Sequence, residues 1–128
     1  MHHDNDIRFA HHRLDVYGVA LRLFKGVEEL AGQLPRGYAD ARDQVRRAAS
    51  AVVRNIAEAA AREHAGDKAN RFSIARGEVA ECDAVLEMML VLGVVDGPEV
   101  VRLRRLADRV SAMLLGLVRR ERRNAGVP

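Results

Sequence analysis

One stretch constrains the fold of this chain more than any other: residues 42–62, RDQVRRAASAVVRNIAEAAAR. Its apolar residues recur every three or four positions, the spacing of one face of an α-helix. A line of polar residues borders that face, and polar groups at the edge of a core need hydrogen-bonding partners. The sequence therefore predicts a long helix that packs through one face. The apolar positions are Val45, Ala49, Val52, Ile56 and Ala59, and the polar ones are Gln44, Arg47, Asn55, Glu58 and Arg62.

Four segments in all have helical periodicity, over about residues 14–34, 39–63, 68–92 and 98–123. Turn-forming residues separate them, and we expect Asp67 to cap the third helix, Gly93 to close it and Pro98 to lie in the first turn of the fourth. Gly77, in the middle of the third helix, costs about 1 kcal/mol against alanine, which indicates a close helix crossing. Four helices with short connections predict an all-α, up-down-up-down four-helix bundle.

The chain is 128 residues long, which suits one domain. We expect a flexible N-terminal segment over residues 1–13, a single bundle domain over 14–123 and a tail over 124–128. No apolar run approaches the roughly 18 residues of a membrane span, and the N-terminus has no apolar signal core, so we expect a cytoplasmic protein without membrane association. The lone Cys82 lies among apolar positions and is interpreted as a small buried hydrophobe.

The first helix has more apolar surface than a bundle needs. One stripe runs through Val16, Ala20, Leu23, Val27, Leu30 and Leu34, and a second through Leu14, Tyr17, Leu21 and Phe24. Together they cover about half of the circumference, where an ordinary surface helix needs less. Exposed apolar patches of that extent favour association. We therefore expect a closed homo-oligomer.

Basic charge gathers at the C-terminal end. From Arg102 onward there are eight arginines against Asp108 and Glu121, although the whole chain has a net charge of only +3. Such clustering favours nucleic-acid binding, while the lack of aromatic stacking groups favours a merely solvated face, and both interpretations stay open. The candidate nucleic-acid-binding residues are Arg102, Arg105, Arg109, Arg119, Arg120, Arg122 and Arg123.

The run QVRRAASAVVRNIAEA resembles the signature helix of the 23S rRNA intervening-sequence proteins, through Gln44, Arg47, Ala48, Ser50, Asn55, Ile56, Ala57 and Glu58. Two departures are Val53 and Ala59, where the family often has proline and glycine, so a straighter helix is expected. The resemblance implies a four-helix bundle that assembles as a ring-shaped pentamer. It extends to the third helix through Ala75, Gly77 and Glu81. It also implies a likeness in fold to accessory proteins of diversity-generating retroelements, which assist a reverse transcriptase.

The predicted structural polar network consists of Gln44, Arg47, Asn55, Glu58 and Glu81. We expect Asn55 and Glu58 to form buried hydrogen bonds to a neighbouring helix, so that Asn55→Leu would lower stability by about 1 to 3 kcal/mol. A ligand-binding role is the alternative. Glu58 and Glu81 lack the Glu-x-x-His spacing of di-iron bundles, and no metal or cofactor is expected.

Nothing in the sequence assembles a catalytic centre, because no base, nucleophile or phosphate loop accompanies these residues. We expect no enzyme. The sequence favours an oligomeric scaffold with a basic surface that binds RNA or DNA without sequence preference, or that assists a nucleic-acid enzyme such as a reverse transcriptase. The alternative is a structural or protein-binding oligomer with no nucleic-acid role.

Overall fold

Four helices contain most of residues 6–126, the part of the chain that the computed structural model describes. They follow the sequence periodicity, and within this part of the chain there is no β-strand. A short 3₁₀ helix precedes them. The elements are η2 (Ala10–Arg13), α1 (Asp15–Ala31), α2 (Ala39–Ala61), α3 (Ala65–Leu92) and α4 (Gly97–Asn124).

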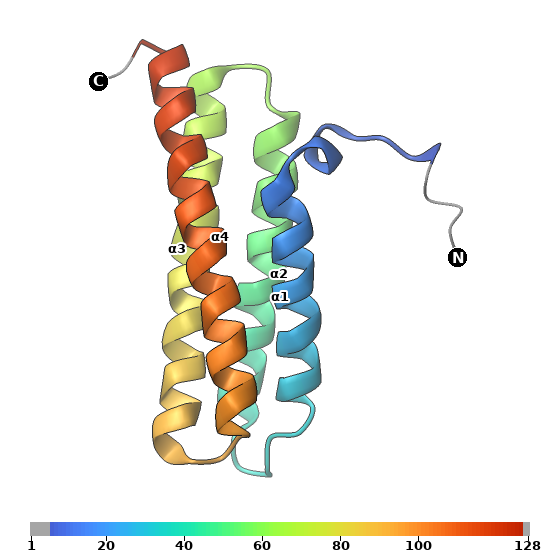
Figure 1. The fold of residues 1–128 in the computed structure, drawn as a ribbon, viewed down its shortest axis with the longest axis vertical. Coiled ribbons are helices and arrows are strands. Elements are labelled where there is room, and N and C mark those ends of the chain that lie inside the picture. Colours follow the sequence, from blue (N-terminus) through green and yellow to red (C-terminus); the bar gives the residue numbers. More distant parts are fainter. Residues whose placement is uncertain (1–5, 127–128) are drawn as a thin grey trace.

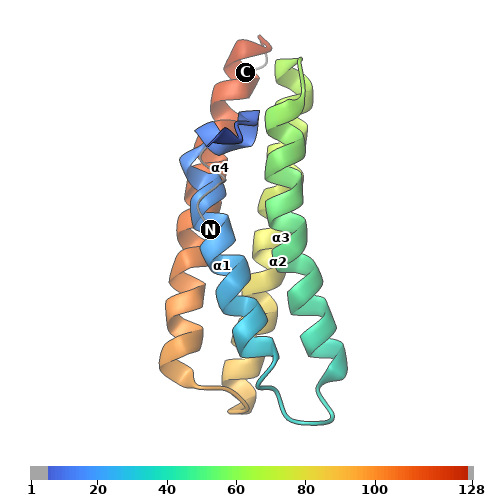
Figure 2. The same ribbon diagram turned by 90° about the vertical axis from the view of Figure 1, so that its right-hand side faces the viewer.

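The helices pack side by side around one core. Each helix contacts the next one along the chain, and α4 returns to contact α1. Figures 1 and 2 show the four long axes roughly aligned, with the α1–α2 and α3–α4 loops at one end and the α2–α3 loop at the other. All four helices therefore contribute to the same interior.

The apolar face of α2 lies in that interior. Val45, Val52, Ile56 and Ala59 are fully buried, and Ala49 is 1% exposed. They pack with large side chains from the other three helices, among them Leu23, Phe72 and Leu103. Burial of one such aliphatic or aromatic side chain contributes about 1.5–3 kcal/mol. The prediction of a helix packed through this face is confirmed, and so is the burial of Cys82, which is inaccessible to solvent.

The turn between α3 and α4 also follows the sequence. Gly93 ends α3 in the left-handed conformation, with φ of 68°, which glycine adopts without steric cost. Asp96 precedes α4, and its carboxylate accepts a hydrogen bond from the Glu99 amide at 3.1 Å. Pro98 lies in the first turn of the helix, where its missing N–H leaves no hydrogen bond unmade.

The predicted start of α3 is wrong. The helix begins at Ala65 and His64 precedes it, without a side-chain cap. Asp67, expected as the cap, lies within the first turn. A carboxylate there still stabilises the helix, because its charge faces the positive end of the helix dipole. The connection from α2 is correspondingly shorter than the predicted loop over residues 64–67.

Gly77 does not mark a helix crossing, so that prediction is wrong as well. A Cβ atom built on Gly77 would meet nothing within 4 Å. The close approach is instead at Gly26 of α1, which is buried. A Cβ atom there would collide with the Leu103 side chain of α4. Gly26 therefore allows α1 and α4 to pack closely.

The segment before α1 is partly structured. Within the predicted flexible segment, η2 lies against α2 and α1, and the rings of His11 and Tyr17 lie 4.5 Å apart between centroids. Residues 6–9 extend away from the bundle (Figure 1). Residues 1–5 of that segment, and 127–128 of the predicted tail, lie outside the described residues.

Across residues 6–126, none of the helices has the length and hydrophobicity to cross a membrane.

Candidate functional site

The polar line of α2 meets α3 through an arginine that the sequence analysis did not identify. Arg71 donates a hydrogen bond to Asn55 Oδ1 at 3.4 Å and lies 3.4 Å from Glu58 Oε2. Asn55 Nδ2 donates to the Ala51 carbonyl at 2.9 Å, and Arg62 lies 4.0 Å from Glu58. The Glu58 side chain is 53% exposed. The predicted link to a neighbouring helix therefore exists, but the prediction that Glu58 is buried in it is wrong.

The remaining members of the predicted network lie apart from this cluster. Arg47 of α2 and Glu81 of α3 form their own ion pair, with 3.6 Å between Nη2 and Oε1. Gln44 is exposed and makes no side-chain hydrogen bond to any residue that the structure describes. The structure therefore divides the five predicted residues into Asn55 and Glu58, which both contact Arg71, an Arg47–Glu81 ion pair and a solvated Gln44.

A further ion pair connects α3 to α4. Arg104 binds Asp83 through two nitrogens, at 2.8 and 3.2 Å, and lies 3.6 Å from Glu87. The hydrogen bond to Asp83 raises the pKa of Arg104 above its ordinary value. A two-point guanidinium–carboxylate contact is geometrically specific. It fixes the register of the two helices and holds two α3 carboxylates, Asp83 and Glu87, against α4.

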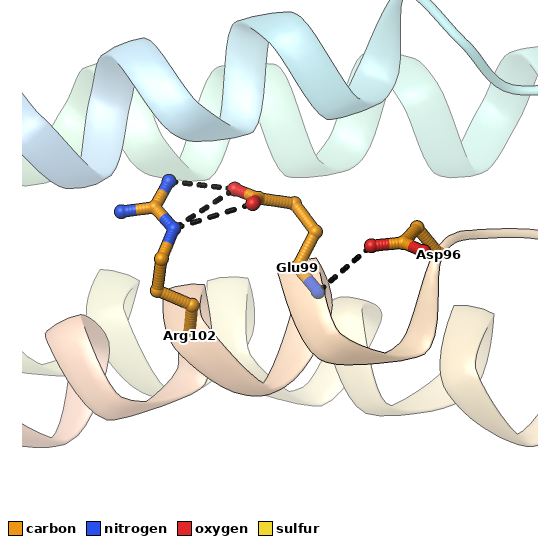
Figure 3. A network of polar contacts seen from close by, with 3 residues as sticks. All are labelled: Asp96, Glu99 and Arg102. Carbon is orange, nitrogen blue, oxygen red and sulfur yellow. Dashed lines mark hydrogen bonds and ion pairs between the residues drawn. The ribbon is translucent and has the colours of Figure 1, made fainter.

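Two of the candidate nucleic-acid-binding arginines are already paired. Figure 3 shows Arg102 folded onto Glu99, one turn earlier in α4, with its shortest contact at 2.6 Å. The hydrogen bond from Arg102 lowers the pKa of Glu99, although partial desolvation opposes it. Arg120 similarly donates to Glu121 at 2.7 and 3.0 Å. Both pairs reduce the positive charge that α4 presents to a partner.

Glu121 is the buried charged residue of this helix, with an exposed fraction of 5%. Burial alone would raise the pKa of its carboxyl group, but hydrogen bonds from Arg120 and Asn124 and the charges of Arg120 and Lys68 outweigh burial and lower it. The carboxylate therefore stays ionised. The sequence does not indicate this burial, since the residue types beside Glu121 do not show how deeply the last turns of α4 pack.

The other five candidates are exposed and form no ion pair within the described residues: Arg105, Arg109, Arg119, Arg122 and Arg123. Six exposed positions of α4, spaced alternately four and three residues apart, form one outward seam. They are Arg105, Arg109, Ala112, Gly116, Arg119 and Arg123. Every position of that seam is exposed. At about 1.5 Å per residue the seam is about 27 Å long, enough to span several phosphates of a nucleic acid.

A hollow of about 500 Å³ beside this seam contains both signs of charge. Asp83 and Arg104, paired as described, line it with Arg105, Asp108 and Ser111.

Across residues 6–126, no three His, Cys, Asp or Glu side chains gather as metal ligands do. Burial, with the nearby Asp83 and Glu81, raises the pKa of the Cys82 thiol to about 12. That thiol is therefore protonated and sequestered at neutral pH, which makes it a poor nucleophile.

These features define a small all-α bundle protein with exposed arginines along one helix and ion pairs that join its helices. The family model for the 23S rRNA-intervening sequence proteins matches residues 12–116, most of the chain. The chain belongs to this family. No curated protein matches it significantly.

Proposed function

We propose that this protein is a non-enzymatic oligomeric scaffold whose basic surface binds nucleic acid without sequence preference, in the cytoplasm. Such a scaffold would serve by holding RNA or DNA, or by assisting a nucleic-acid enzyme such as a reverse transcriptase. The observation that carries the proposal is the outward seam of α4. Arg105, Arg109, Arg119 and Arg123 lie on it with unpaired guanidinium groups among residues 6–126.

Phosphate is the ligand that this seam suits. Guanidinium groups bind phosphate oxygens through two parallel hydrogen bonds. Ala112 and Gly116 lie between the arginines, and neither has a side chain that can hydrogen bond to base edges. Contacts to phosphate position a nucleic acid but do not read its sequence, so binding without sequence preference is expected.

The test is a titration of mixed-sequence duplex DNA, duplex RNA and single-stranded RNA with wild type and with a variant that carries Arg105→Glu, Arg109→Glu and Arg119→Glu. We expect wild-type binding that weakens steeply with salt, because phosphate contacts release counterions, and a large loss of binding in the variant. The matched control carries Arg22→Glu, Arg36→Glu and Arg54→Glu, three exposed arginines outside α4. Equal binding by both variants, or no wild-type binding at low salt, would refute the proposal.

The assembly we propose is a ring of five up-down-up-down bundles, the number five resting on family resemblance. Its physical support is the second apolar stripe of α1. Leu21 is 41% exposed, and Leu14, Tyr17 and Phe24 are only partly buried against the core. A ring repeats the arginine seam on one rigid body, and linked contacts raise apparent affinity by about 10² or more.

A structural or protein-binding oligomer is the second candidate. It is favoured by a separate apolar surface at the end of α3, where Met88 is 58%, Val91 80% and Leu92 59% exposed. Exposed apolar residues that cluster in this way are typical of protein interfaces. Oligomerisation with no detectable nucleic-acid binding at low salt would favour this second candidate.

A further inference from the structure

The last turns of α4 lie between two grooves of similar size. The α1-side groove has a volume of about 480 Å³, and Arg13, Gly116 and Arg123 are among its lining residues. The α3-side groove has a volume of about 430 Å³, and Arg76, Gly77 and Arg122 are among its lining residues. Each groove is therefore lined by arginine from α4 and by one arginine from another element.

The charge of the two grooves is mostly uncompensated. In the α1-side groove, Arg120 is neutralised by Glu121, and Asp15 is the acidic residue that lines the groove together with Arg13 and Arg123. The α3-side groove has no acidic lining residue within the described part of the chain. By contrast, the hollow beside the first half of α4 contains Asp83 and Asp108. Positive charge from three elements thus converges on the second half of α4.

The floors of the grooves are open. A Cβ atom built on Gly77 or on Gly116 would meet nothing within 4 Å. Arg76 lies across the α3-side groove, where its Nε donates to the Ser111 carbonyl of α4 at 3.3 Å. Glycine allows a ligand backbone to approach the helix closely. These walls suit a phosphodiester strand better than a globular side-chain surface, because they combine arginine with empty space.

The spacing of the grooves indicates what kind of nucleic acid fits. They are separated by the width of one helix, about 10–12 Å with its side chains, and the major groove of B-form DNA is about 12 Å wide. In A-form RNA the major groove is deep and too narrow for side chains to enter. We propose that the second half of α4 lies along the major groove of duplex DNA, with one phosphodiester backbone in each groove. This inference rests on the proposed nucleic-acid function and names its ligand.

The proposed arrangement gives a role to Gly77 of α3 and to Ala112 of α4. Gly77 weakens α3 as a helix but keeps the α3-side groove open. Ala112, exposed between the grooves, would face the base edges without offering them a hydrogen-bonding side chain. Binding would therefore depend on the two backbones.

Neutralising the groove arginines outside α4 tests the arrangement. A variant with Arg13→Gln and Arg76→Gln should lower the slope of log K against log salt for duplex DNA by about 2, one unit per lost phosphate contact. Raising salt from about 50 to 200 mM would then weaken this variant about tenfold less than wild type. The control, Arg22→Gln with Arg36→Gln, removes the same charge elsewhere and should keep the wild-type slope.

A second variant blocks the space without changing charge. Gly77→Leu should weaken duplex DNA binding severalfold while it strengthens the helix, since leucine is a better helix former than glycine, so unfolding cannot explain the loss. Wild type should also prefer duplex DNA to duplex RNA of the same sequence. Equal affinity for both duplexes, or wild-type salt slopes in Arg13→Gln with Arg76→Gln, would overturn the groove arrangement. If the triple glutamate variant of α4 still lost binding in that case, the proposed nucleic-acid function would stand without the groove arrangement.

Discussion

At the scale of single residues, Gly26 controls how closely α1 and α4 pack. Because a Cβ atom at Gly26 would collide with Leu103, Gly26→Leu should lower the free energy of unfolding by about 1–3 kcal/mol through overpacking. Urea denaturation measures this change in the free energy of unfolding. Gly77→Leu is the matched control in an open helical position and should instead raise stability by about 0.5–1 kcal/mol. Equal effects at the two glycines would contradict the close α1–α4 contact.

Glu121 should make stability depend on acidic pH. The pKa of its carboxyl group lies below the ordinary value of 4.5 in the folded protein, so its contribution is present above the unfolded pKa and lost as pH falls through the folded pKa. Glu121→Gln should flatten the decline of Tm over that acidic range. Glu63→Gln, at an exposed position near the α2–α3 turn, is the control and should keep the wild-type decline. An unchanged pH profile in Glu121→Gln would show that the ionised form is not favoured by folding.

Neighbouring residues in the sequence predict the surroundings of some of these residues but not of others. Cys82 was predictable, because its apolar neighbours at helical spacing place it in the core. Gly26, Arg71 and Glu121 were not, because each depends on an atom of another helix or on the packing of a helix end. A glycine at a crossing and a glycine on an open surface, such as Gly26 and Gly77, look alike until the neighbouring helix is in place.

At the scale of helices, the contact between α2 and α3 through Asn55 is half solvated. Its hydrogen bond to Arg71 is long, at 3.4 Å, and exchange with water costs little at such a position. Asn55→Leu should therefore lower stability by only about 0.5–1 kcal/mol, less than the sequence alone suggested. Gln44→Leu, on the same helix at an exposed position, should change it by less than about 0.5 kcal/mol. A loss of about 1 to 3 kcal/mol at Asn55 would instead indicate the buried network that the sequence suggested.

Helix existence followed directly from periodicity, whereas one helix start did not. The residues Gly66 and Asp67 are typical of turns, yet both lie inside the first turn of α3. Packing of Ala69 and Phe72 into the core favours extending the helix back over them, and Asp67 is well placed by charge. The arginine seam of α4 was predictable for a related reason: a core stripe at helical spacing fixes which residues point outward. The structure was needed to show which of these arginines form ion pairs.

At the scale of the whole molecule, the apolar surfaces of α1 and of the end of α3 belong to different corners of the bundle. The helices contact one another in the order α1–α2–α3–α4–α1, without an α1–α3 contact among the described residues. One copy therefore cannot cover its own surplus surface with the other. Unlike patches on one subunit suit head-to-tail contacts, which close into rings when the rotation between neighbours allows it.

Subunit association through α1 is testable by mass. Light scattering at micromolar concentration should report about 71 kDa, five copies of a 14.2-kDa chain. Leu21→Glu places a charge on the exposed apolar stripe without entering the core, because Leu21 is 41% exposed in a single chain. Burying an unpaired carboxylate between subunits is costly, so the variant should shift to smaller species while circular dichroism keeps the helical signal.

Leu92→Glu is the matched control for this last prediction, since Leu92 is 59% exposed at the end of α3. If α1 alone forms the contact, only Leu21→Glu dissociates the assembly. If both variants dissociate it, the subunits meet head to tail, α1 of one copy against the end of α3 of the next, as unlike patches in a ring require. A wild-type mass of 14.2 kDa would instead show that the second stripe of α1 does not hold copies of this chain together.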